Sequence, residues 1–311
     1  MLVAVLAVAA ACTHGTHARA GRHSAYASSS TAVSSPPVVS GWPGSANTGV
    51  PAGTVLSAYT GPMTITQCGT VISGRTITGD LTIAASNHTT SPNTPCVSIQ
   101  SSLIHGTVDA GSTLGATGPL VMTDVEVAAP TTSDQSSVVG SNYYLWRVNV
   151  HGGAKGAIQC AGDCAIHDSW THDFYLTGTS HYDGIGSNGT NNSPLVIDHN
   201  TIDCNFSATA PGATGGCSGD IGLFGDFSAI SNVTITHNLF IGSTSPSYCL
   251  YAGTDPGKRY PTATNITITG NTFQRGPTGK CGYYGPVAKW APGNGNTWTN
   301  NTYDDGTPIT P

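Results

Sequence analysis

The segment that decides the fold is Asn232-Val-Thr-Ile-Thr-His-Asn-Leu-Phe240. It recurs as Asn265-Ile-Thr-Ile-Thr-Gly-Asn-Thr-Phe273, and related segments occupy residues 195–202 and 296–303. Weaker copies with the same order of apolar and polar residues lie at 96–104, 120–127, 145–150 and 164–170. Repeats spaced roughly 30 to 40 residues apart are typical of a chain built from stacked, similar units.

Each copy predicts a short β-strand, because apolar and polar residues alternate along it. An Asn or Asp after the strand can adopt the left-handed conformation and turn the chain. A second segment, rich in glycine and apolar residues, follows at 156–159, 183–185, 219–224, 248–251 and 281–284. One such coil cannot bury its own apolar side chains, whereas stacked coils share a continuous core. The sequence therefore predicts an all-β solenoid.

The composition agrees with this fold class and excludes several functions. Asp and Glu number 16 and Lys and Arg 10, which is 8% of the 311 residues, against roughly 25% in ordinary soluble domains. Glu126 is the only Glu, so good charged helix formers are scarce. A coiled coil, an ion-paired helical repeat and a basic nucleic-acid-binding face are excluded.

The first twenty residues have the pattern of a secretory signal peptide. Residues 2–11 form an apolar run too short to span a bilayer, and Ala18-Arg19-Ala20 offers a cleavage site. Residues 21–40 are rich in Ser, Ala and Pro and predict a linker, and residues 41–311 predict one β-helix domain. We expect a secreted, extracellular monomer without a transmembrane helix, in preference to a lipoprotein anchored through Cys12.

Eight cysteines remain after the predicted cleavage, an even number that favours disulfides in an oxidising compartment. Proximity in the sequence predicts the pairs Cys68 with Cys96, Cys160 with Cys164, Cys204 with Cys217, and Cys249 with Cys281. Half of a metal or redox site is the alternative for Cys160 and Cys164, but no second thiol pair has ligand spacing.

The N-x-T-I-T-x-N-x-F copies resemble the right-handed parallel β-helix proteins of the pectate-lyase-like superfamily, in particular secreted actinobacterial ones. The resemblance extends from about Thr70 to Tyr303 and implies a single-stranded right-handed parallel β-helix. Residues 41–68 would then cap the first coil, and the tail from Asp304 would close the last. Caps are needed because an open solenoid end exposes unpaired strand edges.

The sharpest candidate site is His181-Tyr-Asp183-Gly-Ile185. Residues two apart on a strand share a face, so His181 and Asp183 should point the same way and could act as a catalytic pair. Ile185 would share that face unless Gly184 marks a bend or bulge. The motif is similar to the Asn-x-Asp-Gly segment of polygalacturonase-like glycoside hydrolases, with His181 replacing the Asn. The resemblance implies that Asp183 belongs to a carboxylate set that protonates the leaving sugar and activates water.

On the next coil we choose Asp220 as the partner of Asp183. An offset of one layer and two residues would separate them by about 8 Å, which suits inversion, whereas stacking near 5 Å would suit retention or a calcium site. A paired Asp-Asp, Gly-His-Gly and Arg-x-Lys of the polygalacturonase pattern are absent. Both Asp183 and Asp220 can equally be turn formers beside glycines. The residues expected to bind substrate are His172, Tyr182, Asp226, Lys258 and Arg259.

These observations favour a carbohydrate-active enzyme that cleaves an extracellular polysaccharide in a groove of the β-helix, by carboxylate-based glycoside hydrolysis with Asp183, Asp220 and His181 as catalytic residues. A polysaccharide lyase is the first alternative, and it would need Lys155, Lys258 or Lys289 as base and Ca²⁺ to neutralise charge. A non-catalytic glycan-binding protein or adhesin is the second. We assign no metal ligands.

Overall fold

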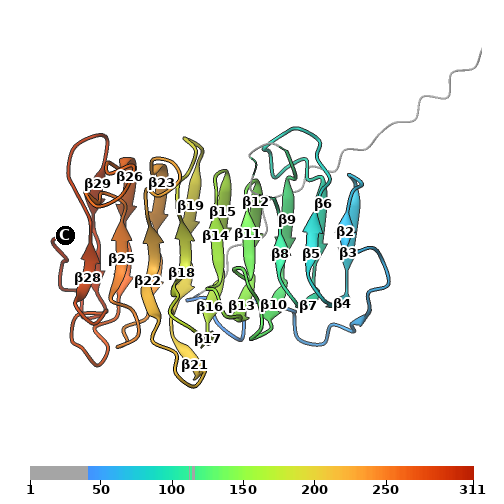
Figure 1. Ribbon diagram of the computed structural model, residues 1–311, viewed down its shortest axis with the longest axis horizontal. Coiled ribbons are helices and arrows are strands. Elements are labelled where there is room, and N and C mark those ends of the chain that lie inside the picture. The colour runs from blue at the N-terminus through green and yellow to red at the C-terminus, as the bar shows by residue number, and fades with distance from the viewer. Residues whose placement is uncertain (1–40, 112, 114–115) are drawn as a thin grey trace, which may run out of the picture. The chain divides into compact units, whose positions relative to one another are not determined.

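The computed structural model describes residues 41–111, 113 and 116–311. The predicted signal peptide, the linker and Cys12 lie outside the described residues. The described chain contains strands and no helix, and it winds as a right-handed parallel β-helix with three long, entirely parallel sheets (Figure 1). The predicted fold class is confirmed.

The three sheets, which we name A, B and C, each receive about one strand from every coil. Sheet A consists of β1 (Ser57–Ala58), β4 (Arg75–Thr78), β7 (Leu103–His105), β10 (Glu126–Ala129), β13 (Asn149–Gly152), β16 (Trp170–His172), β20 (Thr201–Ile202), β24 (Leu239–Phe240), β27 (Thr272–Phe273) and β30 (Thr302–Tyr303). Sheet B consists of β2 (Thr64–Ile65), β5 (Leu81–Ile83), β8 (Val108–Asp109), β11 (Val138–Gly140), β14 (Ile158–Cys160), β18 (His181–Ser187), β22 (Gly216–Leu223), β25 (Tyr248–Ala252) and β28 (Gly285–Ala288). Sheet C consists of β3 (Thr70–Ser73), β6 (Val97–Gln100), β9 (Leu120–Thr123), β12 (Tyr143–Trp146), β15 (Cys164–His167), β19 (Leu195–Asp198), β23 (Ser231–Thr236), β26 (Thr264–Thr269) and β29 (Thr297–Thr299). The short pair β17 (Phe174–Leu176) and β21 (Phe206–Thr209) forms a separate parallel sheet that projects at one edge (Figure 1).

Each repeated segment, weak or strong, contains residues of a sheet C strand and, after a turn, of the next sheet A strand. The strands of sheet C align in register, so that Ile166, Ile197, Ile235 and Ile268 stack directly on one another. All four side chains are fully buried. Each coil thus contributes an apolar side chain to a column that only stacking can shield from water, which is the reason the repeats require one another.

The turn after several sheet C strands differs in one detail from the sequence prediction. The left-handed residue in the stronger copies is His199, His237 or Gly270, with φ of 53°, 53° and 68°, and the Asn comes one residue later. Asn200 and Asn238 instead point inward and are fully buried. The prediction was therefore wrong at Asn200 and Asn238, whose amides pair inside with backbone groups that would otherwise be unsatisfied. It was right in other copies, where Asp124, Asp168 and Asn300 follow the strand with φ of 57°, 51° and 55°.

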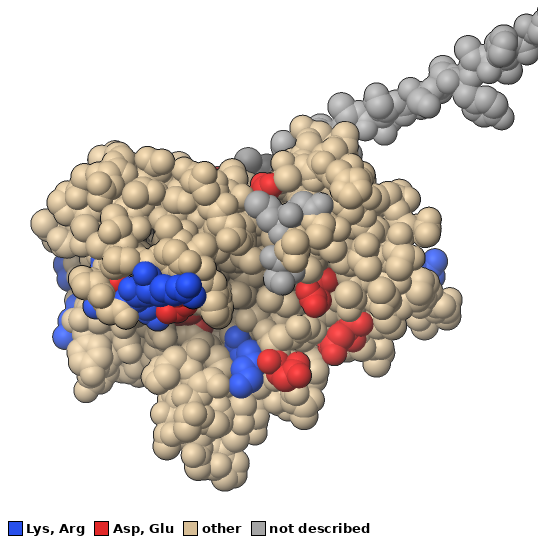
Figure 2. Space-filling model, turned by 45° about the horizontal axis from the view of Figure 1, so that its top comes forward, with Lys and Arg blue, Asp and Glu red and all other residues tan. Residues whose placement is uncertain are grey.

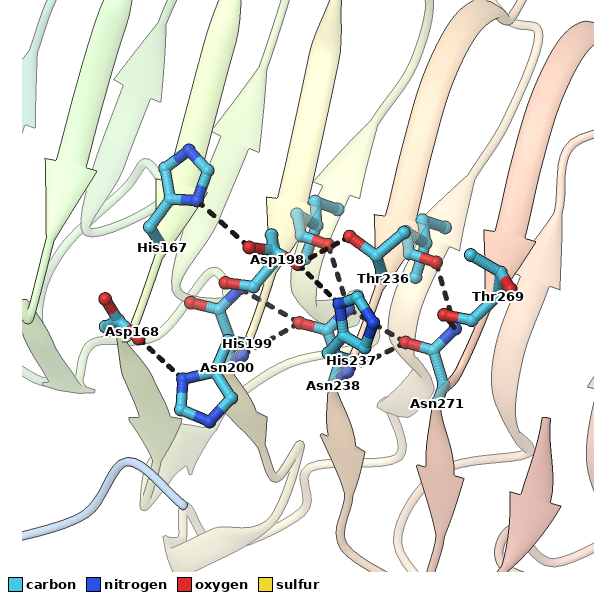
Figure 3. A network of polar contacts seen from close by, with 12 residues as sticks. His167, Asp168, Asp198, His199, Asn200, Thr236, His237, Asn238, Thr269 and Asn271 are labelled. Carbon is cyan, nitrogen blue, oxygen red and sulfur yellow. Dashed lines mark hydrogen bonds and ion pairs between the residues drawn. The ribbon is translucent and has the colours of Figure 1, made fainter. Parts of the chain in front are cut away.

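The buried asparagines Asn200, Asn238 and Asn271 form a ladder (Figure 3). The ladder continues to Asn301, whose Oδ1 accepts a hydrogen bond from the backbone N–H of Asn271. The Oδ1 of Asn238 accepts two hydrogen bonds from Asn200, one from its backbone N–H at 2.9 Å and one from the side-chain Nδ2 of Asn200 at 3.0 Å. The Nδ2 of Asn238 donates to the carbonyl of Ile197 at 2.9 Å. Each rung therefore ties one coil to the next through the interior.

All four predicted disulfides are present, Cys68 with Cys96, Cys160 with Cys164, Cys204 with Cys217, and Cys249 with Cys281. Cys160 and Cys164 pair with each other, so the alternative of a metal or redox site at this spacing is not realised. Cys160–Cys164 and Cys204–Cys217 are separated by 4 and 13 residues, whereas Cys68–Cys96 and Cys249–Cys281 are separated by 28 and 32. The disulfides therefore join residues of the same coil or of neighbouring coils rather than distant parts of the chain.

The two ends of the solenoid are covered in different ways. The tail returns over the last coil, where Ile309 is buried and its carbonyl accepts a hydrogen bond from the indole N–H of Trp298 at 2.8 Å. The prediction for the first coil was wrong in part, because β1 and β2 already belong to the sheets. Residues 41–50 pass along the flank instead, with Trp42 stacked on His199 at 5.6 Å between ring centroids.

Within the described residues we find no helix that is long and apolar enough to cross a membrane.

Candidate functional site

The candidate site is built on β18 and β22, and an irregularity in their pairing determines which side chains face outward. Tyr182 pairs with Cys217, but Asp183 pairs with Gly219, so β22 has one extra residue, Ser218, at this point. A bulge of this kind redirects the side chains that follow it. Asp183 lies on β18, the strand without the extra residue, and it points away from the core, into a hollow on the outer face of sheet B.

The chain bends directly after Asp183, as the sequence required. A Cβ added to Gly184 would meet interior groups, among them Ile202 at 2.8 Å, and Ile185 is fully buried. Two consecutive residues therefore face inward, and Gly186 faces outward again beside the Asp183 side chain. His181 and Asp183 both line the hollow, in agreement with the predicted shared face.

Two glycines make room for the Asp183 carboxyl group. A Cβ on Gly222 would lie 2.2 Å from Asp183 Oδ1 and 2.3 Å from its Cγ, and one on Gly186 would lie 3.2 Å from Oδ2. Gly186 and Gly222 are register partners on adjacent strands. The Asp183 carboxyl group lies directly against the backbone of Gly222, and the side chain of any larger residue at position 222 would occupy the same space.

The environment of Asp183 favours its protonated form. The Oδ1 atom is buried and has no hydrogen-bond partner. Burial raises the pKa of Asp183 to about 7, although a hydrogen bond from the Gly219 backbone and the positive charge of Lys258 act in the opposite direction. Near neutral pH, Asp183 is therefore protonated in a large fraction of the molecules, and its carboxyl group faces the hollow.

The main hollow has a volume of about 540 Å³ and is bordered by Asp134, Lys155, Gln159, Asp183, Asp226 and Lys258. It extends from the loop before β11 to the loop after β25, across five layers of sheet B. Charged side chains are sparse on the side of the molecule seen in Figure 2. One cluster of Lys and Arg side chains (blue) is separated by a depression from another basic group that lies beside an acidic one (red). The volume is in the range of small-molecule sites.

The two lysines of the main hollow have different partners. Lys258 Nζ forms an ion pair with Asp226 Oδ2 at 2.9 Å and lies 4.7 Å from the centroid of the Phe224 ring. Lys155 Nζ donates a hydrogen bond to Ser180 Oγ at 3.1 Å. Within the described residues Lys155 has no carboxylate partner among the ion pairs, so its ammonium group can receive an anionic ligand.

Asp220 does not line the main hollow. The predicted pairing of Asp220 with Asp183 is not formed there, because the bulge changes the register between β18 and β22. Between the pairs Asp183 with Gly219 and Ile185 with Ile221, Asp220 occupies the level of Gly184, which faces inward. Asp220 is fully buried, and its Oδ1 accepts a hydrogen bond from the Cys204 backbone N–H at 2.8 Å. The inverting geometry expected from Asp183 and Asp220 therefore loses its second carboxylate.

We expect Asp220→Asn to stabilise the protein at about pH 8 and to have much less effect at about pH 4. Burial raises the pKa of Asp220 well above its ordinary value, and Asp203 and Asp183 raise it further. The folded state retains a proton that the unfolded chain has released, so the contribution of Asp220 to stability falls as the pH rises above about 4. Thermal unfolding of both proteins at the two pH values measures this, and an equal change at both would contradict it.

The structure divides the predicted site residues into two groups. His181, Tyr182, Asp183, Asp226 and Lys258 all line the main hollow. Tyr182 forms part of its wall, since its ring is buried and its hydroxyl donates to the carbonyl of Thr177 at 2.9 Å. The residues that do not line it are Asp220, His172 and Arg259.

His172 belongs to sheet A, on a different side of the coil. Its ring stacks on Trp170 at 3.4 Å between centroids, and its two nitrogens contact Asp173 Oδ2 at 2.8 Å and Asn149 Oδ1 at 2.9 Å. These contacts satisfy the imidazole, so a role in substrate binding is not supported. Arg259 is exposed, with its guanidinium 5.5 Å from the ring centroid of Tyr260.

One group of potential metal ligands occurs in the described residues. Asp220, Cys249 and Cys281 bring ligand atoms within 4.8 Å of one another. The two sulfurs are joined as a disulfide, however, and a disulfide sulfur does not offer the thiolate that a metal requires. This group therefore gives no metal centre.

Sequence reasoning did not identify Asp134 or Gln159 as site residues. Gln159 follows from register, because Val139, Gln159, Gly186 and Gly222 occupy one outward row across β11, β14, β18 and β22. The glycine-rich second segments of the repeats contain this row, so its pattern was visible but not its alignment. Asp134 lies in a loop, and its position carried no repeat signal.

No family model, curated protein or solved structure was found to match this chain.

Proposed function

We propose that the protein cleaves a polysaccharide in the main hollow by glycoside hydrolysis, with Asp183 as the general acid. The observation that carries the proposal is the Asp183 carboxyl group, which faces the hollow over Gly222 with its Oδ1 buried and unpartnered. A proton donor must hold its proton at the working pH and release it to the leaving oxygen. The raised pKa of about 7 meets the first requirement.

Asp226 is the best candidate for the carboxylate that activates water. Asp226 lines the same hollow and accepts a hydrogen bond from Lys258, which stabilises its negative charge. Its environment therefore differs from that of Asp183, whose carboxyl group is desolvated. Two carboxyl groups in unlike environments are what glycoside hydrolysis requires, one to donate a proton and one to accept it. Lys155 supplies a cation for an acidic group on the substrate.

Membership of the pectate-lyase-like superfamily and an extracellular location are parts of the same proposal. The parallel β-helix and the N-x-T-I-T-x-N-x-F repeats support the first. The apolar run at residues 2–11 and four disulfides support the second, because disulfides persist in oxidising compartments.

The test is to incubate the purified protein with a panel of neutral and acidic polysaccharides and to follow reducing ends and ultraviolet absorbance together. We expect new reducing ends without the absorbance of an unsaturated sugar. The rate should fall as the pH rises through about 7, because Asp183 then loses its proton. In Asp183→Asn the rate should fall by about 10²- to 10⁴-fold, the usual contribution of a general acid.

Other outcomes identify the alternatives. Absorbance together with reducing ends would establish a lyase and overturn hydrolysis, with Lys155 as the first candidate base. Binding of a glycan without any cleavage across the panel would favour the non-catalytic protein. Cleavage that survives in Asp183→Asn at the wild-type rate would remove Asp183 from the mechanism.

A further inference from the structure

A second hollow lies beside the first, and the proposed function does not use it. The side hollow, of about 390 Å³, is bordered by Val139, Gln159, Ala161, Asn188, Asn191 and Phe227. Val139, Gln159 and Asn188 border both hollows, so the two hollows adjoin. The side hollow lies toward the carboxyl ends of β11, β14 and β18.

A single loop after β22 forms a wall of both hollows. Its residues Phe224 and Asp226 line the main hollow, whereas Phe227 lines the side hollow. The backbone N–H of Phe227 donates to the carbonyl of Asn188 at 2.8 Å, which fixes the loop to the coil below. The Phe227 ring is nevertheless 78% exposed, an unusual position for a large apolar side chain that is held in place.

The two hollows differ sharply in charge. The main hollow is bordered by Asp134, Asp183, Asp226, Lys155 and Lys258. Among the described residues that border the side hollow, none is charged, and its polar groups are the amides of Gln, Asn and the backbone. Neutral amides suit hydroxyl groups, and an exposed ring suits the C–H face of a sugar.

We propose that the side hollow is a binding subsite for an uncharged sugar that is linked to the charged sugar held in the main hollow. The inference rests on the proposed function, because it takes the ligand of the main hollow to be an acidic glycan. The exposed ring of Phe227 stacks on the sugar face, and Gln159 and Asn188 reach its hydroxyl groups. The substrate class is then a mixed glycan in which acidic and neutral sugars adjoin, rather than a chain of acidic sugars alone.

The test compares two probes of equal length, an oligosaccharide of four uronic acids and one that alternates uronic acids with neutral sugars. Binding of each is measured by calorimetry on the whole protein, in the Asp183→Asn background if the wild type cleaves them. We expect the alternating probe to bind about fivefold more tightly, the size of one aromatic contact. Phe227→Ala should remove this preference, and Phe227→Tyr, which keeps the ring, should retain it.

Lys155→Met serves as the matched control, since it should weaken both probes alike and leave their ratio unchanged. Equal binding of the two probes by the unsubstituted protein, or a preference that persists in Phe227→Ala, would overturn the subsite. These outcomes are separate from the cleavage assay. A Phe227-dependent preference without any cleavage would keep the subsite and reject the enzyme, whereas cleavage without the preference would do the reverse.

Discussion

Gly222→Ala is expected to lower the rate of glycan cleavage by about 10²-fold, the cost typical of misplacing a reacting group by about 1 Å. The new Cβ would lie 2.2 Å from Asp183 Oδ1, so the carboxyl group must move out of its position. The colliding atoms are the end of a side chain, which can rotate, and Gly222 does not have a positive φ. The loss should therefore appear in the rate and hardly in the melting temperature.

Gly216→Ala is the matched control on the same strand. A Cβ at this position would meet no heavy atom within 4 Å, and Gly216 likewise lacks a positive φ. Its rate and melting temperature should equal those of the wild type. Wild-type cleavage by Gly222→Ala would show that the position of the Asp183 carboxyl group over Gly222 is not the reactive one.

Asn238→Ala is expected to have the largest effect on stability, a loss of about 3–5 kcal/mol in the free energy of unfolding. The substitution removes the acceptor of the Asn200 backbone N–H and the donor to the Ile197 carbonyl, both inside the solenoid. Each buried group left without a partner costs about 1–3 kcal/mol. Denaturant unfolding followed by circular dichroism measures the difference.

The control for this substitution is Thr234→Ala, an outward-facing position on β23 in the same coil. A change of no more than about 0.5 kcal/mol is expected, as for most surface positions. If Asn238→Ala were no more destabilising than Thr234→Ala, the asparagine ladder in Figure 3 would not contribute to the free energy of unfolding.

The sequence alone determined the architecture, because the features that specify it are local and repeated. Alternation in segments such as 232–240 predicts strands, and their recurrence predicts parallel stacking. The disulfides followed from the same regularity, since cysteines near one another in the sequence belong to the same coil or to neighbouring coils. The shared face of His181 and Asp183 also followed from strand periodicity.

The composition of the site was decided by the tertiary structure. One extra residue, Ser218, shifts the register of β22 against β18 and turns Asp220 into the core, whereas Asp183 remains outside. Neither strand shows this alone, because a bulge is a property of a pair. The main hollow likewise depends on loops after β22 and β25, which bring Asp226 and Lys258 beside Asp183. Repetition specifies how coils stack, but the side chains that meet across them depend on register and loop path, which only the folded chain defines.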